Sequence, residues 1–179
     1  MKFVKLDSVC RYRTETTEAA RPNVENYVST ESMLPDRGGI RTPTSIPQTG
    51  KIKIFRKGDV LISNIRPYFK KIWQADRNGT CSNDVLVFEA TSCNPDYLFW
   101  SLMDDAFFSY VTKTSKGTKM PRGDKNSIMQ YEISLPAKSS QEAVCSILGA
   151  IQSKININQK LNGYFAPRKQ PSKRLFLQT

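Results

Sequence analysis

The sequence predicts an α/β (α+β) fold, in which a mixed, β-rich domain is followed by a long C-terminal α-helix. Three observations predict this fold. Short runs rich in β-branched and aromatic residues crowd into residues 51–88, a helical pattern opens after Asn94, and apolar residues recur at helical spacing beyond Ser140. The 179 residues allow one domain with an appendage. We expect the domain to span residues 1–138, the helix 139–162, and a basic, flexible tail 163–179.

The β-rich block contains three strand patterns. Lys51–Phe55 alternates polar and apolar residues, whereas Val60–Ser63 and residues 85–88 are nearly continuous apolar runs typical of buried strands. Asn78-Gly79 is a typical tight turn and predicts a hairpin. Residues 11–50 are rich in Thr, Pro, Arg and Gly and are expected to be loop-rich. Shorter strands are expected at residues 3–6, 27–30 and 132–136.

A helix is expected to begin at Asn94-Pro95, because Asn is a good N-cap and Pro suits the first helical position. Gly117 is its expected end. Asp104 and Asp105 fall within this pattern, where we expect them to be solvated. The apolar residues are expected to pack in the core rather than to stack on bases: Leu98, Leu102, Phe107, Tyr110 and Val111.

The C-terminal helix should begin near Ser140 and end near Gly163, with the acidic residue Glu142 in its first turn. About 22 residues at a 1.5 Å rise give a length of about 33 Å. Its apolar stripe implies a partner helix, although folding back onto its own domain is an alternative. The stripe consists of Val144, Ile147, Leu148, Ile151, Ile155 and Leu161. The basic tail beyond it contains Arg168, Lys169, Lys173 and Arg174.

The charge favours a polyanionic partner. The chain has 27 Lys+Arg against 16 Asp+Glu, a net charge of +11, and a pI of about 9.6. A merely solvated basic surface is the alternative. The complete absence of histidine excludes Ser-His-Asp and Cys-His catalysis and His-ligated zinc. No P-loop or dinucleotide-binding glycine motif occurs.

The expected location of the protein in the cell follows from its hydropathy, its N-terminal sequence and its cysteines. No apolar run reaches the roughly 20 residues of a membrane span, and the N-terminus lacks a signal-peptide pattern, so we expect a cytoplasmic protein without a membrane partner. The four cysteines are scattered, with no C-x-x-C pair, and are expected to be reduced and apolar in role rather than metal ligands.

Three segments carry candidate nucleic-acid contacts. Arg66 and Arg122 can grip guanine and Asn64 can grip adenine through paired hydrogen bonds, while lysines suit phosphates. In an alternative interpretation, Tyr68 and Phe69 pack in the core and Lys70 and Lys71 are only solvated. The segment after the strand predicted at Val60–Ser63 offers Asn64, Arg66, Tyr68, Lys70 and Lys71. A basic loop at residues 112–127 offers Lys113, Lys116, Lys119, Arg122 and Lys125, and the early loop adds Arg37 and Arg41.

Three stretches together resemble the specificity (S) subunit of type I restriction-modification enzymes. They are the opening residues 4–10 (VKLDSVC), residues 55–67 (FRKGDVLISNIRP), similar to the family's "KGDILIS" strand, and the run from Ser115 through Ile133-Ser134-Leu135-Pro136 to Gln141. Their order over about residues 1–162 makes the combination specific. The resemblance implies a target-recognition domain followed by a spacer helix. Full-length members carry two such repeats, each reading half of a split DNA site, whereas this sequence contains one.

The resemblance also implies partners. They are double-stranded DNA, a methyltransferase (M) subunit and a restriction (R) subunit, with S-adenosylmethionine, ATP and magnesium bound by those subunits and no cofactor bound by this chain. Two copies could pair their helices about a two-fold axis, and a 33 Å helix would match one DNA turn of about 34–36 Å. The alternatives are a stand-alone nuclease or methyltransferase with an unfamiliar site, and a generic RNA-binding module.

Overall fold

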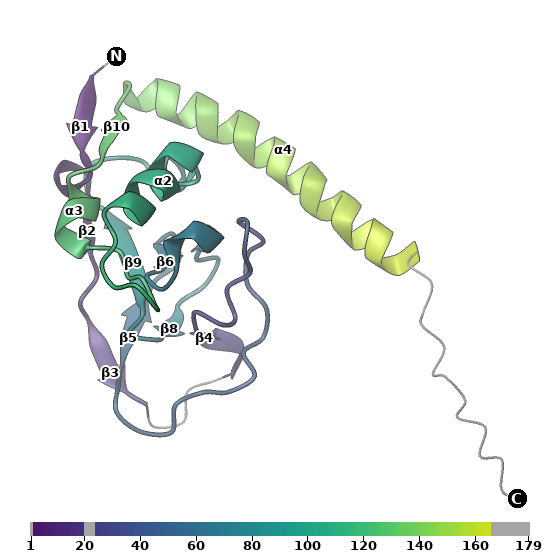
Figure 1. Cartoon of the computed structure of the whole chain (residues 1–179). Coiled ribbons are helices and arrows are strands. Elements are labelled where there is room, and N and C mark those ends of the chain that lie inside the picture. The colour runs from purple at the N-terminus through teal and green to yellow at the C-terminus, as the bar shows by residue number, and fades with distance from the viewer. Residues whose placement is uncertain (1, 20–23, 166–179) are drawn as a thin grey trace, which may run out of the picture. The chain divides into compact units, whose positions relative to one another are not determined.

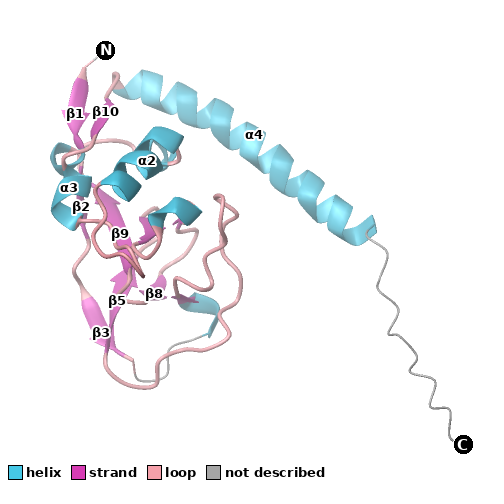
Figure 2. Ribbon diagram, in the orientation of Figure 1, coloured by secondary structure: helices cyan, strands magenta, loops and turns pink. Residues whose placement is uncertain are grey.

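The computed structural model describes residues 2–19 and 24–165 (Figure 1). It divides into two units, with the boundary between Cys145 and Ser146. The first unit contains the strands and the short helices, and the C-terminal part of the long helix α4 belongs to the second (Figure 2). The predicted α+β class is therefore confirmed.

A four-stranded antiparallel sheet forms the centre of the first unit, in the order β2-β9-β6-β7. Its inner strands β6 (Val60–Ser63) and β9 (Val85–Ala90) are the two nearly continuous apolar runs of the sequence. Successive side chains of a strand point to opposite faces, so an inner strand with both faces covered must be apolar throughout. The outer strands are β2 (Cys10–Tyr12) and β7 (Ile72–Gln74).

The two faces of this sheet pack into different cores. Val60, Ile62 and Phe88 belong to one cluster, which includes buried residues of α1 (Pro95–Leu102), α2 (Asp105–Lys113) and α3 (Lys125–Met129). Leu61, Val85 and Val87 belong to a second cluster with Val28, Phe55 and Cys81 from the other four-stranded sheet. The central sheet is thus covered by helices on one face and by strands on the other.

The second sheet has the order β3-β5-β8-β4, in which β4 and β8 run parallel and the other pairs antiparallel. Its strands are β3 (Thr16–Glu18), β5 (Lys51–Phe55), β8 (Gly79–Cys81) and β4 (Tyr27–Val28). A separate two-stranded ladder joins β1 (Phe3–Lys5) to β10 (Glu132–Ser134). Single-turn 3₁₀ helices occur at η1 (Leu6–Ser8), η2 (Val24–Asn26) and η3 (Pro67–Phe69).

The predicted hairpin at Asn78-Gly79 is wrong, because β7 and β8 lie in different sheets. Gly79 is required by close packing: a Cβ there would lie 2.3 Å from the Asn26 carbonyl oxygen and 2.6 Å from Cζ of Phe55. The Asn78 side chain accepts a 2.9 Å hydrogen bond from the Lys57 backbone N–H. The turn-forming pair therefore marks a crossover between sheets.

The single helix predicted after Asn94 is two helices. Asn94 caps α1 as expected, accepting from the Asp96 and Tyr97 backbone N–H groups, but α1 ends at Leu102. Asp104 has an extended backbone and accepts from the Ala106 N–H, so it is the N-cap of α2. The expected core packing is confirmed for the buried residues Leu98, Leu102, Phe107 and Val111, and Tyr110 packs partly buried against them.

Helix α4 (Lys138–Phe165) begins two residues before Ser140, continues past Gly163, and has 28 residues rather than 22. Its length at 1.5 Å per residue is therefore about 42 Å. The predicted flexible tail falls mainly on residues 166–179, which lie outside the described residues. Within residues 2–19 and 24–165, none of the helices combines the length and hydropathy needed to cross a bilayer.

Candidate nucleic-acid interface

Two segments predicted separately as DNA contacts lie side by side. The Lys116 and Arg122 backbones exchange hydrogen bonds of 2.8 and 2.9 Å, which closes the loop between them. The Arg66 N–H donates to the Pro121 carbonyl at 2.8 Å, and the Gly123 N–H donates to the Asn64 carbonyl at 3.2 Å. Residues 64–71 and 114–124 thus form one continuous backbone network.

The early turn joins the same network. The backbone N–H groups of Asp36 and Arg37 donate to the carbonyls of Phe69 and Lys70 at 2.9 and 3.0 Å. We call residues 35–39, 64–71 and 114–124 the three-loop surface. All non-glycine residues with positive φ in the described chain lie on it: Asp36, Arg37, Arg66 and Lys70. Such backbone strain is concentrated at functional sites. Here the hydrogen bonds between the loops stabilise the strained backbone conformations.

The basic side chains of the 114–124 loop differ in how far they are neutralised. Lys119 is exposed and forms no hydrogen bond or ion pair with another described residue, and the same holds for the Arg66 side chain. Arg122 is exposed and donates to Asp84 at 3.2 Å. Lys116 pairs with Asp124, and the bond from its ammonium holds the pKa of that carboxyl down at about 2. Within residues 64–71 and 114–124, Lys119 and Arg66 are therefore the cations most available to a polyanion.

Arg37 and Lys70 share one carboxylate. Both donate to Asp105, at 2.7 Å for Lys70, and their hydrogen bonds lower the pKa of the Asp105 carboxyl to about 2. Arg37 also donates to the Met103 carbonyl at 2.6 Å and lies over the Phe108 ring at 5.6 Å. These contacts tie the early turn and the 64–71 loop to α2. Asp105, expected only to be solvated, is therefore a structural anchor.

Lys71 is half-buried beneath the surface. Its ammonium donates to the Thr30 carbonyl at 2.7 Å and lies 5.9 Å from the centre of the Phe69 ring. Burial, with a smaller contribution from nearby Arg41, lowers the pKa of Lys71. This lysine connects the segment at Thr30 to the three-loop surface.

Asn64 is buried in this structure, and its predicted contact with adenine stays a prediction. Its side chain is buried, at 9% exposure, and Oδ1 has no hydrogen-bond partner among the described residues. A Cβ at Gly123 would lie 2.9 Å from that oxygen. In this conformation Asn64 holds the neighbouring loop through its backbone and presents no amide to a base edge.

The other predicted contacts are spread around these loops. Tyr68 and Phe69 are 47% and 39% exposed, with ring centres 4.8 Å apart, so the alternative that they pack in the core is wrong. Lys113 ends α2 and lines a shallow pocket with Tyr68 and Lys70. Lys125 begins α3, and Arg41 lines a different pocket with Arg77. The predicted basic loop is therefore shorter than residues 112–127, because helices hold both its ends.

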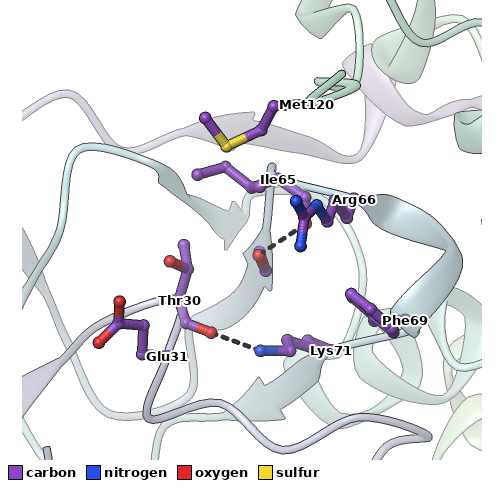
Figure 3. Close-up of a pocket in the computed structure, with 8 residues that line it drawn as sticks. Thr30, Glu31, Ile65, Arg66, Phe69, Lys71 and Met120 are labelled. Atoms are coloured by element: carbon purple, nitrogen blue, oxygen red, sulfur yellow. Dashed lines mark hydrogen bonds between the residues drawn. The ribbon is translucent and has the colours of Figure 1, made fainter. Parts of the chain in front are cut away.

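A pocket of about 240 Å³ opens on the three-loop surface (Figure 3). Met120 and Ile65 lie together on one side, and Lys71 reaches across the other side to the Thr30 carbonyl (Figure 3). Arg66, next to Ile65, and Phe69 also line the pocket (Figure 3). The remaining lining residues are Glu31 and Ser63.

The Lys57-Gly58-Asp59 motif is structural. Gly58 has φ of 91°, and Asp59 accepts from the Arg56 N–H at 2.8 Å. Asp59 also receives the buried Arg13 guanidinium through two bonds of 2.7 and 3.1 Å. These bonds, with those to Glu89 and Glu15, raise the pKa of Arg13. Arg13 was not predicted, because nothing in the local sequence distinguishes it from a solvated arginine.

The described residues of α4 retain an exposed apolar stripe. Val144, Ile147, Ile151, Ile155 and Leu161 are exposed, and Leu148 is half-buried. Ile157 is also exposed but was not included in the predicted stripe. A dimerisation role for these residues stays a prediction.

The comparisons with known proteins decide the family. The type I restriction modification DNA specificity domain family matches residues 1–163. This chain belongs to that family. The resemblance seen in the sequence is thereby confirmed: the chain is a type I specificity subunit sequence with one target-recognition domain, and the specificity subunit family is not in itself catalytic. Among the described residues, no group of three or more Cys, Asp or Glu side chains could hold a metal ion.

Relatives of this specificity-domain chain are considerably longer. It is 27% identical over 154 residues to the type I restriction enzyme HindI specificity subunit of Haemophilus influenzae, covering 80% of this chain and 33% of that subunit. The fold is similar to the crystal structure of the HsdS subunit from Thermoanaerobacter tengcongensis, with a TM-score of 0.67, 23% identity, and coverage of 91% and 45%. The S subunit from M. genitalium gives a TM-score of 0.56 at 16% identity, with coverage of 92% and 44%. The chain thus spans between a third and a half of these proteins.

Proposed function

We propose that this chain reads DNA sequence for a type I restriction-modification system and directs methyltransferase and restriction subunits to a bipartite site. The main support is the convergence of three loops on a family recognition-domain fold, with Arg66, Lys119 and Arg122 exposed together. Cations at a surface of this kind hold phosphates, and guanidinium groups can also read guanine edges. S-adenosylmethionine, ATP and magnesium would be bound by the partner subunits.

The second part of the proposal is that the chain acts as a homodimer through α4. An apolar stripe on a helix of this length is stabilised by a partner helix. A two-fold axis would place two recognition domains on inverted half-sites. The cytoplasmic location expected from the sequence stays a prediction.

The deciding experiment is co-expression with a type I methyltransferase subunit, copurification, and mapping of methylated adenines in host DNA. We expect a stable complex and one split motif, which is absent when this chain is omitted. Failure of the complex to engage duplex DNA at modest ionic strength would refute the proposal. Incubation of the purified chain alone with DNA, magnesium or methyl donor tests the nuclease and methyltransferase alternatives, and competition by duplex RNA tests the RNA-binding alternative.

A further inference from the structure

Apolar side chains are exposed among the cations of the three-loop surface. In residues 2–19 and 24–145, the large exposed hydrophobic residues are Phe3, Tyr68, Phe69, Met120 and Val144. Three of these, Tyr68, Phe69 and Met120, lie on the three-loop surface, among cations. Exposed apolar groups in a cluster indicate contact with a partner. The partner of this surface should therefore be both anionic and apolar in part.

The position of Met120 is fixed by its loop. The paired backbone bonds between Lys116 and Arg122 close the loop at its base, and Pro121 accepts from the Arg66 N–H. Met120 is 46% exposed and lies beside Ile65 at the pocket of Figure 3. Lys119 and Arg122 lie within two positions of it on the same loop. A small apolar group entering here would be covered by the thioether while phosphates or polar base edges meet the cations.

We infer that Met120, together with Ile65, contacts the C5-methyl group of a thymine in the major groove of the target. This inference rests on the proposed function. Among the groups that the four bases present in the major groove, the thymine methyl is the apolar one. Methionine is flexible and polarizable, so its side chain can adapt to such a small group. Met120 is thus a specificity-determining residue that the basic pattern of the sequence did not reveal.

The flanking charge favours duplex DNA over a protein as the occupant of this surface. Arg66 and Lys119 make no ion pair with described residues, and a protein partner would have to supply carboxylates to both while burying Met120 between them. A DNA backbone supplies anionic groups at regular spacing along both edges of the groove. In the major groove of duplex DNA, the thymine C5-methyl group supplies an apolar contact between the two phosphate backbones.

The test removes only the methyl group. Once the methylated motif is known, duplexes are made in which each thymine of the motif is replaced singly by deoxyuridine, and affinity is measured by fluorescence anisotropy with the complex of this chain and its methyltransferase. We expect one thymine per half-site at which deoxyuridine weakens binding about threefold to fivefold, the change expected for one buried methyl group. Met120→Ser removes the contact in both half-sites of a homodimer, so it should weaken binding to the thymine duplex by about the square of that factor, roughly tenfold to twenty-fivefold, and should not discriminate thymine from deoxyuridine.

Phe3→Ser is the matched control, because it removes another exposed apolar side chain, on β1, away from the loops. It should leave the deoxyuridine penalty unchanged. Thermal unfolding checks that both variants fold. Sequence-specific binding without any deoxyuridine penalty, or a penalty that persists in Met120→Ser, would overturn this inference and leave the proposed function intact. Loss of all specific binding by the unmodified complex would instead overturn both.

Discussion

Arg122 and Lys119 lie on one loop but differ in how their charge can be used. The planar guanidinium of Arg122 can grip guanine through two bonds, whereas the Lys119 ammonium is a point charge suited to phosphate. We expect Arg122→Ala to weaken binding to the cognate duplex by about 1–3 kcal/mol and to relax preference at one position. Lys119→Ala should weaken cognate and scrambled duplexes alike and reduce the salt slope by about one unit for each protomer bound.

The measurement for both substitutions is anisotropy titration over a series of salt concentrations. Arg122 also pairs with Asp84, so Asp84→Asn is the control that removes this ion pair while keeping the arginine. Unchanged affinity together with unchanged sequence preference in Arg122→Ala would reject its assignment as a base contact.

Asp105 forms ion pairs with both Arg37 and Lys70, so these two cations are less available to other anions. Its pKa in the folded chain, about 2, lies below that of an unfolded aspartate. The carboxylate therefore stabilises the fold above about pH 4, and this contribution is lost as pH falls toward 2. Asp105→Asn should lower the thermal midpoint at pH 6, and the difference from the unmodified protein should shrink through that window. Glu132→Gln, on β10, removes another exposed carboxylate that forms no ion pair with a described residue, and it should leave the thermal midpoint at pH 6 nearly unchanged.

The same substitution should affect DNA binding in the opposite direction. Without Asp105, two cations on the three-loop surface become available to phosphate, so affinity and salt dependence should both rise. Glu132→Gln makes the same change in net charge on the β1–β10 ladder and serves here too as the control. Equal effects of the two variants would show that only net charge matters.

Asp59 is the partner that the buried Arg13 most depends on. The pair is bidentate, and both side chains are nearly inaccessible to solvent. Removing one member of a buried pair leaves an uncompensated charge, at a cost of about 3–5 kcal/mol. We expect Asp59→Ala to lower the free energy of unfolding by about 3 kcal/mol, near the lower end because Glu15 and Glu89 also contact Arg13. Urea unfolding measures it, and a loss below about 1 kcal/mol would contradict a structural role for the motif.

At the scale of elements, patterns that report burial were reliable and patterns that report turns were not. The apolar runs that became β6 and β9 were predicted correctly, because a strand covered on both faces has to be apolar. The short strands β2 and β3 were missed, since three residues carry too little periodicity to detect. Asn78-Gly79 was misinterpreted because its role depends on contacts with residues distant in the sequence. Asp104 was misinterpreted because its role depends on which backbone N–H groups need a cap.

Helix α4 offers a test of the homodimer with a matched pair of substitutions. Ile151 lies on the exposed apolar stripe, and Ser153 lies two positions away on the other side of the helix. A carboxylate on the stripe would be buried without a partner if two helices pair. We therefore expect Ile151→Asp to raise the dimer dissociation constant at least tenfold and Ser153→Asp to leave it near its original value. Analytical ultracentrifugation provides the measurement, and a monomer in the unmodified protein at high concentration would contradict pairing.

At the scale of the whole chain, the candidate site could be predicted only in pieces. Three basic segments were recognised, but nothing in the sequence indicates that the Arg66 N–H bonds Pro121 or that Arg37 bonds the Lys70 carbonyl. These contacts join residues separated by tens of positions, so no local pattern encodes them. The burial of a single loop residue is likewise not encoded by a local pattern. For this reason Asn64 was expected at the surface and the exposed Met120 was overlooked.

The spacing of the DNA half-sites tests how two recognition domains are held. If paired α4 helices form a rigid connection, adding one base pair between half-sites rotates one of them by about 34–36° and moves it by about 3.4 Å. The second domain can then no longer meet its half-site, so affinity should fall toward that of a single half-site. Changing the spacer sequence at constant length should have little effect. The measurement is a titration of duplexes whose spacers differ by one base pair in either direction. Equal affinity across these lengths would mean that the two domains bind independently and that α4 does not set their separation.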